Sequence, residues 1–370
     1  MSYDICYSMD EKMYPTECRI PTIQLKNRRL MLRFLAILWI GLWAFPVSAQ
    51  TSGTTATVVP SRESTAESTL ATITFNAIAS PRTSWSQSDS ETTVGRIVDF
   101  NAANIIYKLP PDDSLKTRNA IEVTKITFEW LSEDAAGANK AFESGSFSDV
   151  IRLGKLAIAG GQLPSWQQRF LVAKMVEAFW QSNQKVIAGK LFLSLLKDSS
   201  PSLVYASAPL TWQPTKMDSA TTEVALGWVK ESESYDSQLL GASWLLGTSD
   251  SSGAIEALQR VSRQPNVHLA RLATAQLWRV ATPKEVASKF QEWRTVRDLL
   301  PVALQLGPTL TIAEKLERAS LQAEALDEYI RVIAVEPPKS YACILAKKRA
   351  SEILRSLNRP EEAKRLLPST

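Results

Sequence analysis

Side chains that commonly carry catalysis are scarce in this sequence. His268 is the only histidine among 370 residues, so the chain cannot build a metal site from paired histidines, and a Ser-His-Asp triad would have no histidine to spare. His268 lies in an expected helix start, residues 266–271, where a structural or capping role is the simpler interpretation. Cys343 follows a helical pattern beside apolar residues, which favours a buried, inert thiol over a reactive one.

Adjacent carboxylates are the other possible source of acid–base chemistry. Three pairs fall at expected turns or helix N-termini: Asp112 and Asp113, Glu133 and Asp134, and Glu361 and Glu362. The helix dipole already accounts for acids at helix N-termini. General acid–base catalysis needs carboxylates that converge in one cleft, and the spacing gives no reason to bring these pairs together. We therefore predict a protein that is not an enzyme, with no catalytic residue, no cofactor and no metal.

Tryptophan is the most distinctive residue type. Nine tryptophans follow residue 49: Trp85, Trp130, Trp166, Trp180, Trp212, Trp228, Trp244, Trp278 and Trp293. Indoles stack on sugars or on nucleic-acid bases, so a binding role for them is one interpretation. Most of them fall on helical apolar stripes, which favours packing between helices. Trp212 lies in a proline-rich stretch and is the one that we assign to a candidate interaction surface.

The N-terminal 49 residues have the pattern of a secretory signal. Three arginines at 28, 29 and 33 precede an apolar run, 34–47, and small residues at 47 and 49 predict cleavage after Ala49. A membrane anchor is the alternative, but the run is shorter than the ~20 residues that span a bilayer. Met31 is an alternative start, which would make residues 1–30 an over-extension. We expect an exported protein of the periplasm or cell surface with no membrane span after cleavage.

Charge and composition change after the signal. Residues 1–49 carry six basic and four acidic side chains, so the remainder holds +2 of the net +4, which gives no argument for nucleic acid as a partner. Cys6 and Cys18 also lie in that segment, and Cys343 alone cannot form an internal disulfide. Residues 50–69 are rich in Ser and Thr and predict a disordered stalk.

Residues 70–131 have the texture of a small β-module. Short β-branched and aromatic runs at 72–75, 94–100, 104–109 and 120–130 predict strands. Turns are expected at 101–104 and 110–113. The pair 95–100 and 105–107 resembles the strand pairs of small SH3-like or Sm-like barrels. A β-hairpin cap on a helical domain is the alternative.

The stretch 325–337 reads as an amphipathic helix. Its apolar stripe has helical spacing: Leu326, Tyr329, Ile330 and Ile333. Ala325, Tyr329 and Pro337 match the spacing of the second helix of a tetratricopeptide repeat, which this stretch resembles. The resemblance implies stacked helical hairpins, because one hairpin cannot bury its apolar face alone.

A small or compact residue recurs at the corresponding position of each expected second helix: Val150, Ala188, Ala254, Ala287, Ala325 and Ala363. The separations are 38, 66, 33, 38 and 38 residues, and 66 is twice 33. We therefore predict a mainly α fold: an α-solenoid of antiparallel hairpins at 132–198 and 220–370, with a small β-module before it. A proline-rich insertion, 199–219, separates the two runs of hairpins.

The resemblance implies a scaffold or adaptor that binds another protein through the solenoid surface in the cell envelope. The C-terminal hairpin is basic, and Lys348, Arg355 and Arg359 form a candidate surface for an acidic segment of that partner. A solvated face is the simpler interpretation of these charges. A carbohydrate- or peptidoglycan-binding module and a cell-wall hydrolase are the alternative functions.

Overall fold

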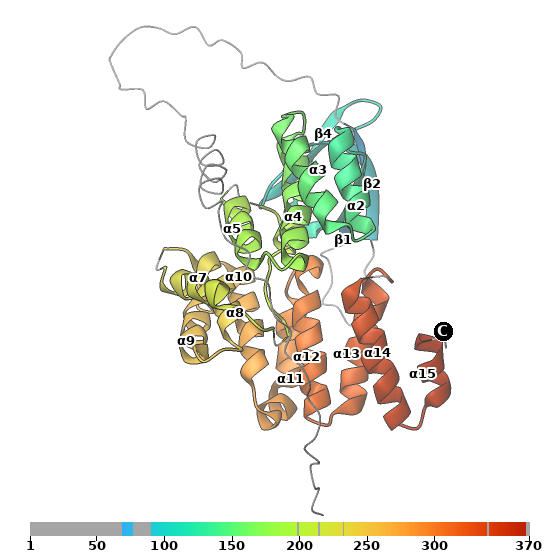
Figure 1. Ribbon diagram of the computed structural model, residues 1–370. Coiled ribbons are helices and arrows are strands. Elements are labelled where there is room, and N and C mark those ends of the chain that lie inside the picture. Colours follow the sequence, from blue (N-terminus) through green and yellow to red (C-terminus); the bar gives the residue numbers. More distant parts are fainter. Residues whose placement is uncertain are drawn as a thin grey trace, which may run out of the picture. The chain divides into compact units, whose positions relative to one another are not determined.

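The computed structural model describes residues 69–76, 90–197, 200–213, 215–231, 233–338 and 340–367 (Figure 1). All of them belong to one compact unit, Ser64–Thr370. The predicted signal at 1–49, the predicted stalk up to residue 68 and Trp85 lie outside the described residues. No helix among the described residues is both long and apolar enough to cross a membrane.

The N-terminal part is a five-stranded antiparallel sheet with the order β4-β3-β2-β1-β5. Its strands are β1 Leu70–Asn76, β2 Ser90–Phe100, β3 Asn104–Leu109, β4 Ser114–Asn119 and β5 Val123–Phe128. The predicted turn at 101–104 is present, and the Asn101 side chain fixes it by accepting from the backbone N–H groups of Ala103 and Asn104. Strand β4 was not predicted, because its polar sequence has the composition of a loop.

Fourteen α-helices follow within the described residues. They are α2 Glu133–Glu143, α3 Phe147–Ala159, α4 Ser165–Gln181, α5 Lys185–Leu196, α6 Ser202–Tyr205, α7 Ser219–Lys230, α8 Tyr235–Leu245, α9 Ser251–Val261, α10 Val267–Leu277, α11 Pro283–Asp298, α12 Leu306–Arg318, α13 Gln322–Val335, α14 Tyr341–Ser356 and α15 Pro360–Leu366. Most consecutive helices pack side by side. The predicted fold class, mainly α after a small β-module, is therefore confirmed.

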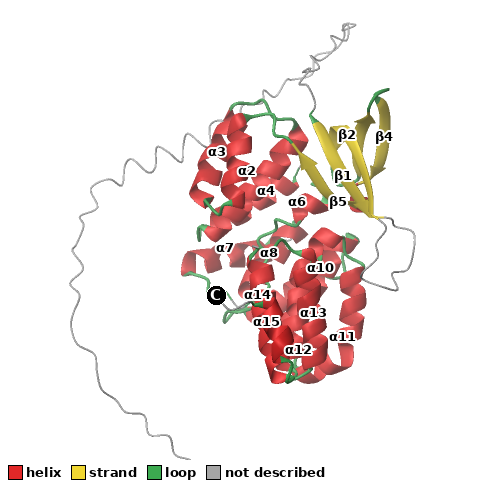
Figure 2. Cartoon of the chain, turned by 90° about the vertical axis from the view of Figure 1, so that its right-hand side faces the viewer, coloured by secondary structure: helices red, strands yellow, loops and turns green. Residues whose placement is uncertain are grey.

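The helices cover one face of the sheet only (Figure 2). Alternate strand residues such as Ile73, Phe75 and Ile105 point to that face and are fully buried. Trp166 and Phe170 of α4 close this core against Phe128 of β5. Helix α4 therefore holds the sheet in place.

Four turns between helices share one conformation. Each contains a residue with positive φ: Gly145, Asn183, Ser320 and Asn358. In each turn the N–H of the next residue donates to the carbonyl five residues before it, at 2.8–2.9 Å, which is the Schellman arrangement that satisfies the last carbonyls of a helix. A fully buried residue follows five positions after the positive φ: Val150, Ala188, Ala325 and Ala363. The positive-φ turn and the buried position five residues after it therefore occur together in all four hairpins.

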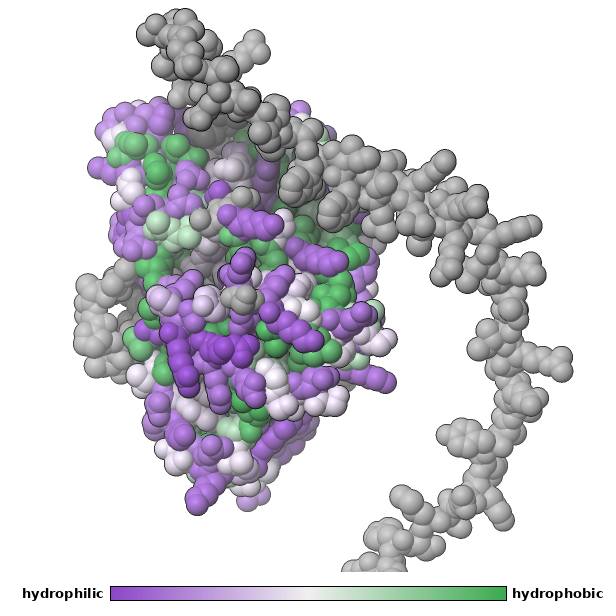
Figure 3. Space-filling model, turned by 90° about the vertical axis from the view of Figure 1, so that its left-hand side faces the viewer, coloured by the Kyte–Doolittle hydropathy of each residue, from purple (hydrophilic) through white to green (hydrophobic). Residues whose placement is uncertain are grey.

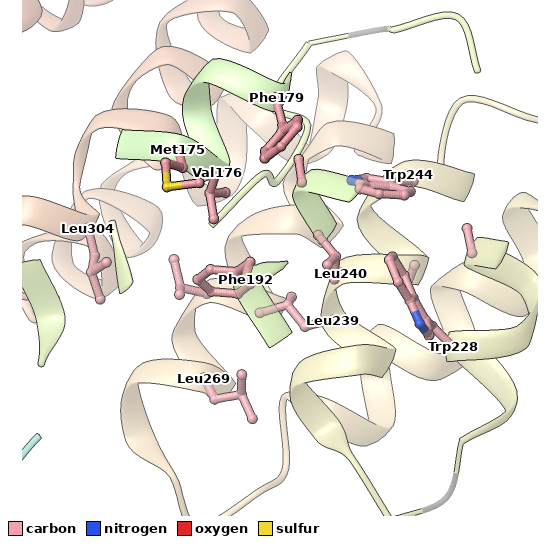
Figure 4. Close-up of a cluster of buried hydrophobic side chains, with 14 of the residues drawn as sticks. Met175, Val176, Phe179, Phe192, Trp228, Leu239, Leu240, Trp244, Leu269 and Leu304 are labelled. Carbon is pink, nitrogen blue, oxygen red and sulfur yellow. The ribbon is translucent and has the colours of Figure 1, made fainter. Parts of the chain in front are cut away.

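Two hydrophobic cores run through the helical part. The first lies among α2 to α10 and contains Trp228 and Trp244, whose ring centroids are 5.1 Å apart (Figure 4). The second lies among α10 to α15 and contains Trp278 and Trp293, which stack at 5.2 Å. These four tryptophans therefore pack in the cores between helices, as their sequence positions predict.

A strap, residues 206–213, joins the two cores. It follows α6 in the stretch where the proline-rich insertion was expected and has neither helix nor strand. Thr211 is buried, and it exchanges hydrogen bonds with Ser243 of α8. The Trp244 indole donates to the Pro209 carbonyl at 2.7 Å. The strap is therefore packed into the helical array rather than looped out from it.

Trp212 of the strap contacts both cores. Its indole lies directly against the backbone of Gly307 in α12, where a side chain as small as a methyl group would overlap the ring. Arg279 also supports this stretch, since its guanidinium donates to Thr211 Oγ1 at 3.1 Å and to the Ser243 carbonyl at 2.9 Å.

Candidate functional site

The described residues form a groove of about 1360 Å³. Its lining comes from α6 and the strap, from the 3-10 turn Val302–Leu304 and from helices α10 to α15, with most residues from α11, α12 and α13. Asn76 and Thr124 of the sheet also line it. The lining mixes aliphatic residues such as Leu310 and Ile330 with arginines and carboxylates.

A row of ion pairs forms part of the groove lining. Arg297 of α11 and Glu328 of α13 are both buried and make a direct salt bridge. The second Glu328 oxygen accepts from Arg294 Nε at 2.6 Å. One buried carboxylate therefore lies between two guanidinium groups.

The row continues along the groove. Asp298 Oδ1 lies 3.0 Å from Arg297 Nε and 2.8 Å from Arg331 Nη2. Arg331 then donates to the neutral Gln305 Oε1 at 3.1 Å, where the row stops. Burial and the nearby Arg297 lower the pKa of Arg331, and Asp298 opposes them. We call this row, from Arg294 to Arg331, the arginine ladder.

The arginine ladder has one more cation than it has anions. Its charges alternate from Arg294 through Glu328, Arg297 and Asp298 to Arg331, so that both ends are arginines. Both terminal side chains keep 21% of their surface exposed. An anion that entered the groove could therefore approach either end.

Helical spacing explains how the sequence builds this ladder. Arg294 and Arg297 are three residues apart near the end of α11, and Glu328 and Arg331 are three apart in α13, so each pair shares one helix face. Glu328 lies directly before the buried Tyr329 and is itself buried. The arginine ladder was not predicted from the sequence. The one signal for it was Glu328, a carboxylate among the packed positions of α13.

Of the residues predicted to form an interaction surface, two lie at this groove. Trp212 is half-buried in its wall, and Arg359 lines it beside α15. Arg359 makes two bonds of 2.7 Å to the carboxylate of Glu362. Lys348 and Arg355 are exposed on α14, and neither lines the groove.

The predicted packing positions are mostly buried. Ala188, Ala254, Ala325 and Ala363 have no exposed surface. Tyr329 is buried as well, and its hydroxyl donates to Glu317 Oε2 of α12 at 2.8 Å.

Two positions complete the set. Pro337 is exposed and follows the end of α13 by two residues. Ala287 was wrongly assigned: it is exposed, and Val286 is the buried residue. The packed stripe of α11 runs through Val286, Phe290 and Trp293, so Ala287 points away from it.

No protein-family model, curated protein or solved structure matches this chain. The function must therefore be argued from the geometry of the described residues.

The described residues contain no group of three or more side chains that could hold a metal ion. His268 is half-buried in the first turn of α10, and its Nδ1 has no partner there. Burial and the neighbouring Arg271 lower its pKa, which favours the neutral ring. The groove is therefore the feature with the strongest claim to a function.

On the face seen in Figure 3, hydrophilic and hydrophobic residues are intermixed, as on an ordinary protein surface. A second, smaller hollow of about 80 Å³ borders Trp212, Arg279 and Lys315, and it is too small for more than a few water molecules.

Proposed function

We propose that the protein is a scaffold or adaptor that binds an extended segment of another protein in the groove lined by the strap and helices α11 to α15. The proposal rests on the volume of the groove and on the residues that line it. Pockets for small molecules occupy roughly 300–1000 Å³ and are mostly apolar. This groove is larger, at about 1360 Å³, and offers charged and aliphatic groups together. An extended polypeptide presents the same mixture of groups.

The repeated Schellman turn supports a tetratricopeptide-like α-solenoid. Turns at Gly145 and Asn183 are 38 residues apart, and those at Ser320 and Asn358 are also 38 apart. Thr221 of α7 is buried and lies 33 residues from both Ala188 and Ala254, so the expected period passes through the middle of the chain. There α6 and the strap stand in place of a first helix. Solenoids of this kind present long surfaces to extended partners.

The arginine ladder favours a partner that carries carboxylates. It holds one excess positive charge next to low-dielectric surroundings, where an added carboxylate interacts more strongly than in water. The partner is therefore expected to be an acidic segment, seated at Arg294 or Arg331 rather than at Lys348 and Arg355.

The sequence pattern supports a place in the cell envelope, after removal of residues 1–49. N-terminal sequencing of the exported protein should give Gln50 as its first residue. An intact Met1 or Met31 on a membrane-embedded form would instead favour an anchor.

The carbohydrate-binding alternative finds less support. Among the described residues, Trp212 is the one tryptophan that lines the groove, and five others are buried in cores: Trp166, Trp228, Trp244, Trp278 and Trp293. Buried indoles cannot stack on a sugar.

Site-specific photocrosslinking in the native envelope tests the proposal. A benzophenone amino acid at Ile330, which lines the groove, should capture a partner protein, whereas the same group at the exposed Lys348 should not. Affinity for the captured partner should then fall for Arg331→Gln, which removes one ladder end but keeps a hydrogen-bonding side chain.

The control is Lys289→Gln, an exposed change on α11 away from the groove. The loss for Arg331→Gln should shrink as salt rises, because added ions screen the charge. Capture from Lys348 alone, or equal affinity of Arg331→Gln and the unchanged protein, would contradict the groove as the binding surface.

A further inference from the structure

The outer face of the sheet, turned away from the helices, exposes four large aliphatic side chains. Leu70, Val94, Val98 and Leu115 all point outward from β1, β2 and β4, and each keeps between 49% and 60% of its surface exposed. An antiparallel sheet with one solvated face normally carries polar residues there. We call this surface the outer sheet face.

Two cations lie side by side in the middle of this face. Strand register places Leu70 opposite Arg96, Arg96 opposite Lys108, and Lys108 opposite Leu115, in one row across four strands. Like charges that face each other across neighbouring strands destabilise a sheet. In the protein without a partner, the facing charges of Arg96 and Lys108 therefore lower the stability of the sheet.

The protein only weakly offsets this repulsion. Arg96 lies 3.2 Å from Asp113, but both side chains are about half exposed, so solvent screens the pair. Within the described residues, Lys108 makes no ion pair, nor does Lys125, which points outward from β5.

The inner face of the same sheet shows the contrast. Arg118 of β4 points inward, over the ring of Phe75, and contacts two carboxylates, Glu91 at 2.6 Å and Glu122 at 2.8 Å. Arg118 is therefore paired with carboxylates, whereas Lys108 on the open side makes no ion pair among the described residues. Lys116 of β4, on the same face as Arg118, makes none either.

Four observations define what could cover it. Aliphatic side chains at the two ends of the row need an apolar stripe. The two central cations need carboxylates next to that stripe. A second copy of this face is excluded as the occupant, because it would bring its own Arg96 and Lys108 against the same charges. None of the outward-pointing strand residues described is aromatic, so the face has no platform on which nucleic-acid bases could stack.

We propose that the outer sheet face docks an amphipathic helix of another protein, with acidic side chains flanking the apolar stripe of that helix. Such a helix would form the layer that α4 already provides on the inner face, since a sheet is stably buried between packed layers. Its carboxylates would lie over Arg96 and Lys108, and its stripe over Leu70, Val94, Val98 and Leu115. This docking does not depend on the proposed groove function.

Binding of synthetic helical peptides to the purified protein tests the proposal. The probe is a labelled 18-residue peptide with leucines at helical spacing and glutamates beside them; a matched peptide has lysine in place of each glutamate. Fluorescence anisotropy should show binding of the glutamate peptide only. The double variant Arg96→Gln/Lys108→Gln should bind it about two- to thirty-fold more weakly, the range expected for losing two exposed charge contacts.

Control variants locate the site. Lys284→Gln/Lys289→Gln removes two exposed cations on α11 and should leave affinity unchanged. Val98→Ser should weaken binding by removing apolar contact, without touching charge. Circular dichroism of every variant checks that the fold is retained.

Several results would overturn the proposal. Equal affinity of Arg96→Gln/Lys108→Gln and the unchanged protein is one. Loss of binding in Arg331→Gln with none in the sheet variants would assign the peptide to the groove. Binding of anionic vesicles through Arg96 and Lys108, with no binding of the glutamate peptide, would make the face a lipid surface instead.

Discussion

Replacement of Gly307 by alanine tests whether the strap is a fixed part of the fold. Gly307 is the second residue of α12, and the Trp212 indole lies against its backbone so closely that a methyl group would overlap the ring. Neighbouring Thr211 is held by Ser243 and Arg279, so the strap cannot shift freely to make room. Gly307→Ala should therefore destabilise the protein.

The expected magnitude combines two opposing effects. Overpacking a well-filled site costs roughly 1–3 kcal/mol. Alanine in place of glycine within a helix stabilises it by up to about 1 kcal/mol, and less in the first turn. We expect the clash to dominate, so that Gly307→Ala lowers the free energy of unfolding by roughly 1–2 kcal/mol.

A double-mutant cycle separates the clash from other effects. In a Trp212→Ala background the ring is gone, so Gly307→Ala should be neutral or slightly stabilising. The coupling free energy between the two sites should then be about 1–3 kcal/mol. Gly253→Ala is the matched control, because a Cβ at this early position of α9 meets open space.

Urea unfolding followed by far-UV circular dichroism measures all of these variants. If Gly307→Ala cost the same free energy with and without Trp212, the close approach of ring and helix would not be the cause. If it cost nothing in the unchanged protein, the strap would yield freely and could not serve as a fixed wall of the groove.

Three further predictions concern the second core and the groove. Ala325→Leu should cost roughly 1–3 kcal/mol by overpacking, and Tyr329→Ala about 3–5 kcal/mol by leaving a cavity; thermal melts that match the unchanged protein would contradict the packing of α13. Glu328→Gln should cost up to about 3–5 kcal/mol in urea titrations, because it removes the buried carboxylate between Arg294 and Arg297 and leaves Arg297 with the more exposed Asp298 alone. Arg297→Met/Glu328→Leu should cost less, and equal losses would count against this account. Burial raises the pKa of the Glu336 carboxyl, and a hydrogen bond with Ser340 opposes this rise. The folded state therefore binds the carboxyl proton more tightly than the unfolded state does. Stability falls as pH rises from the unfolded pKa of about 4.3 through the raised value. Glu336→Gln should accordingly be stabilising relative to the unchanged protein at pH 7 and not at pH 4, and a difference independent of pH would show that the carboxyl is not responsible.

The elements that could be predicted are those with a strong local pattern. The Asn101–Asn104 turn has its asparagine, and α13 has its apolar stripe and closing proline. The Thr282–Glu285 capping box at the start of α11 is equally local. Strand β4, Ser114–Asn119, was not predicted because these residues form a strand only by pairing with β3. The amino-acid composition of the segment does not indicate that pairing.

Ala287 shows the limit of spacing as an argument. A fixed period found an alanine at the expected place, but α11 starts from a capping box rather than from a Schellman turn. Its packed stripe is therefore set one residue earlier, at Val286. Where a positive-φ turn precedes the helix, as before Ala325, the small residue is buried. Where such a turn is present, it marks the residue that faces the neighbouring helix, and Ala254 of α9 is buried without one.

The groove could not be predicted for a different reason. Its walls bring together residues near 206–212, 294–305, 326–336 and 359–366, and no local pattern says that these stretches meet. Arg297 and Asp298 had the appearance of an ordinary charged helix end. The two guanidinium groups beside Glu328 explain why this carboxylate can be buried, and only the structure shows them together.

The strap and the arginine ladder together argue that the groove is formed before any partner arrives. Burial lowers the pKa of Arg279 to about 10, so this side chain stays charged at neutral pH and keeps its hydrogen bonds to Thr211 and Ser243. On the facing wall, the ladder is held by ion pairs within the chain, without any outside anion. A partner would then lose its own conformational freedom on binding, while the groove would lose little. Affinity should therefore respond more to stiffening of the partner segment, for example by proline at a compatible position, than to stiffening of the groove itself.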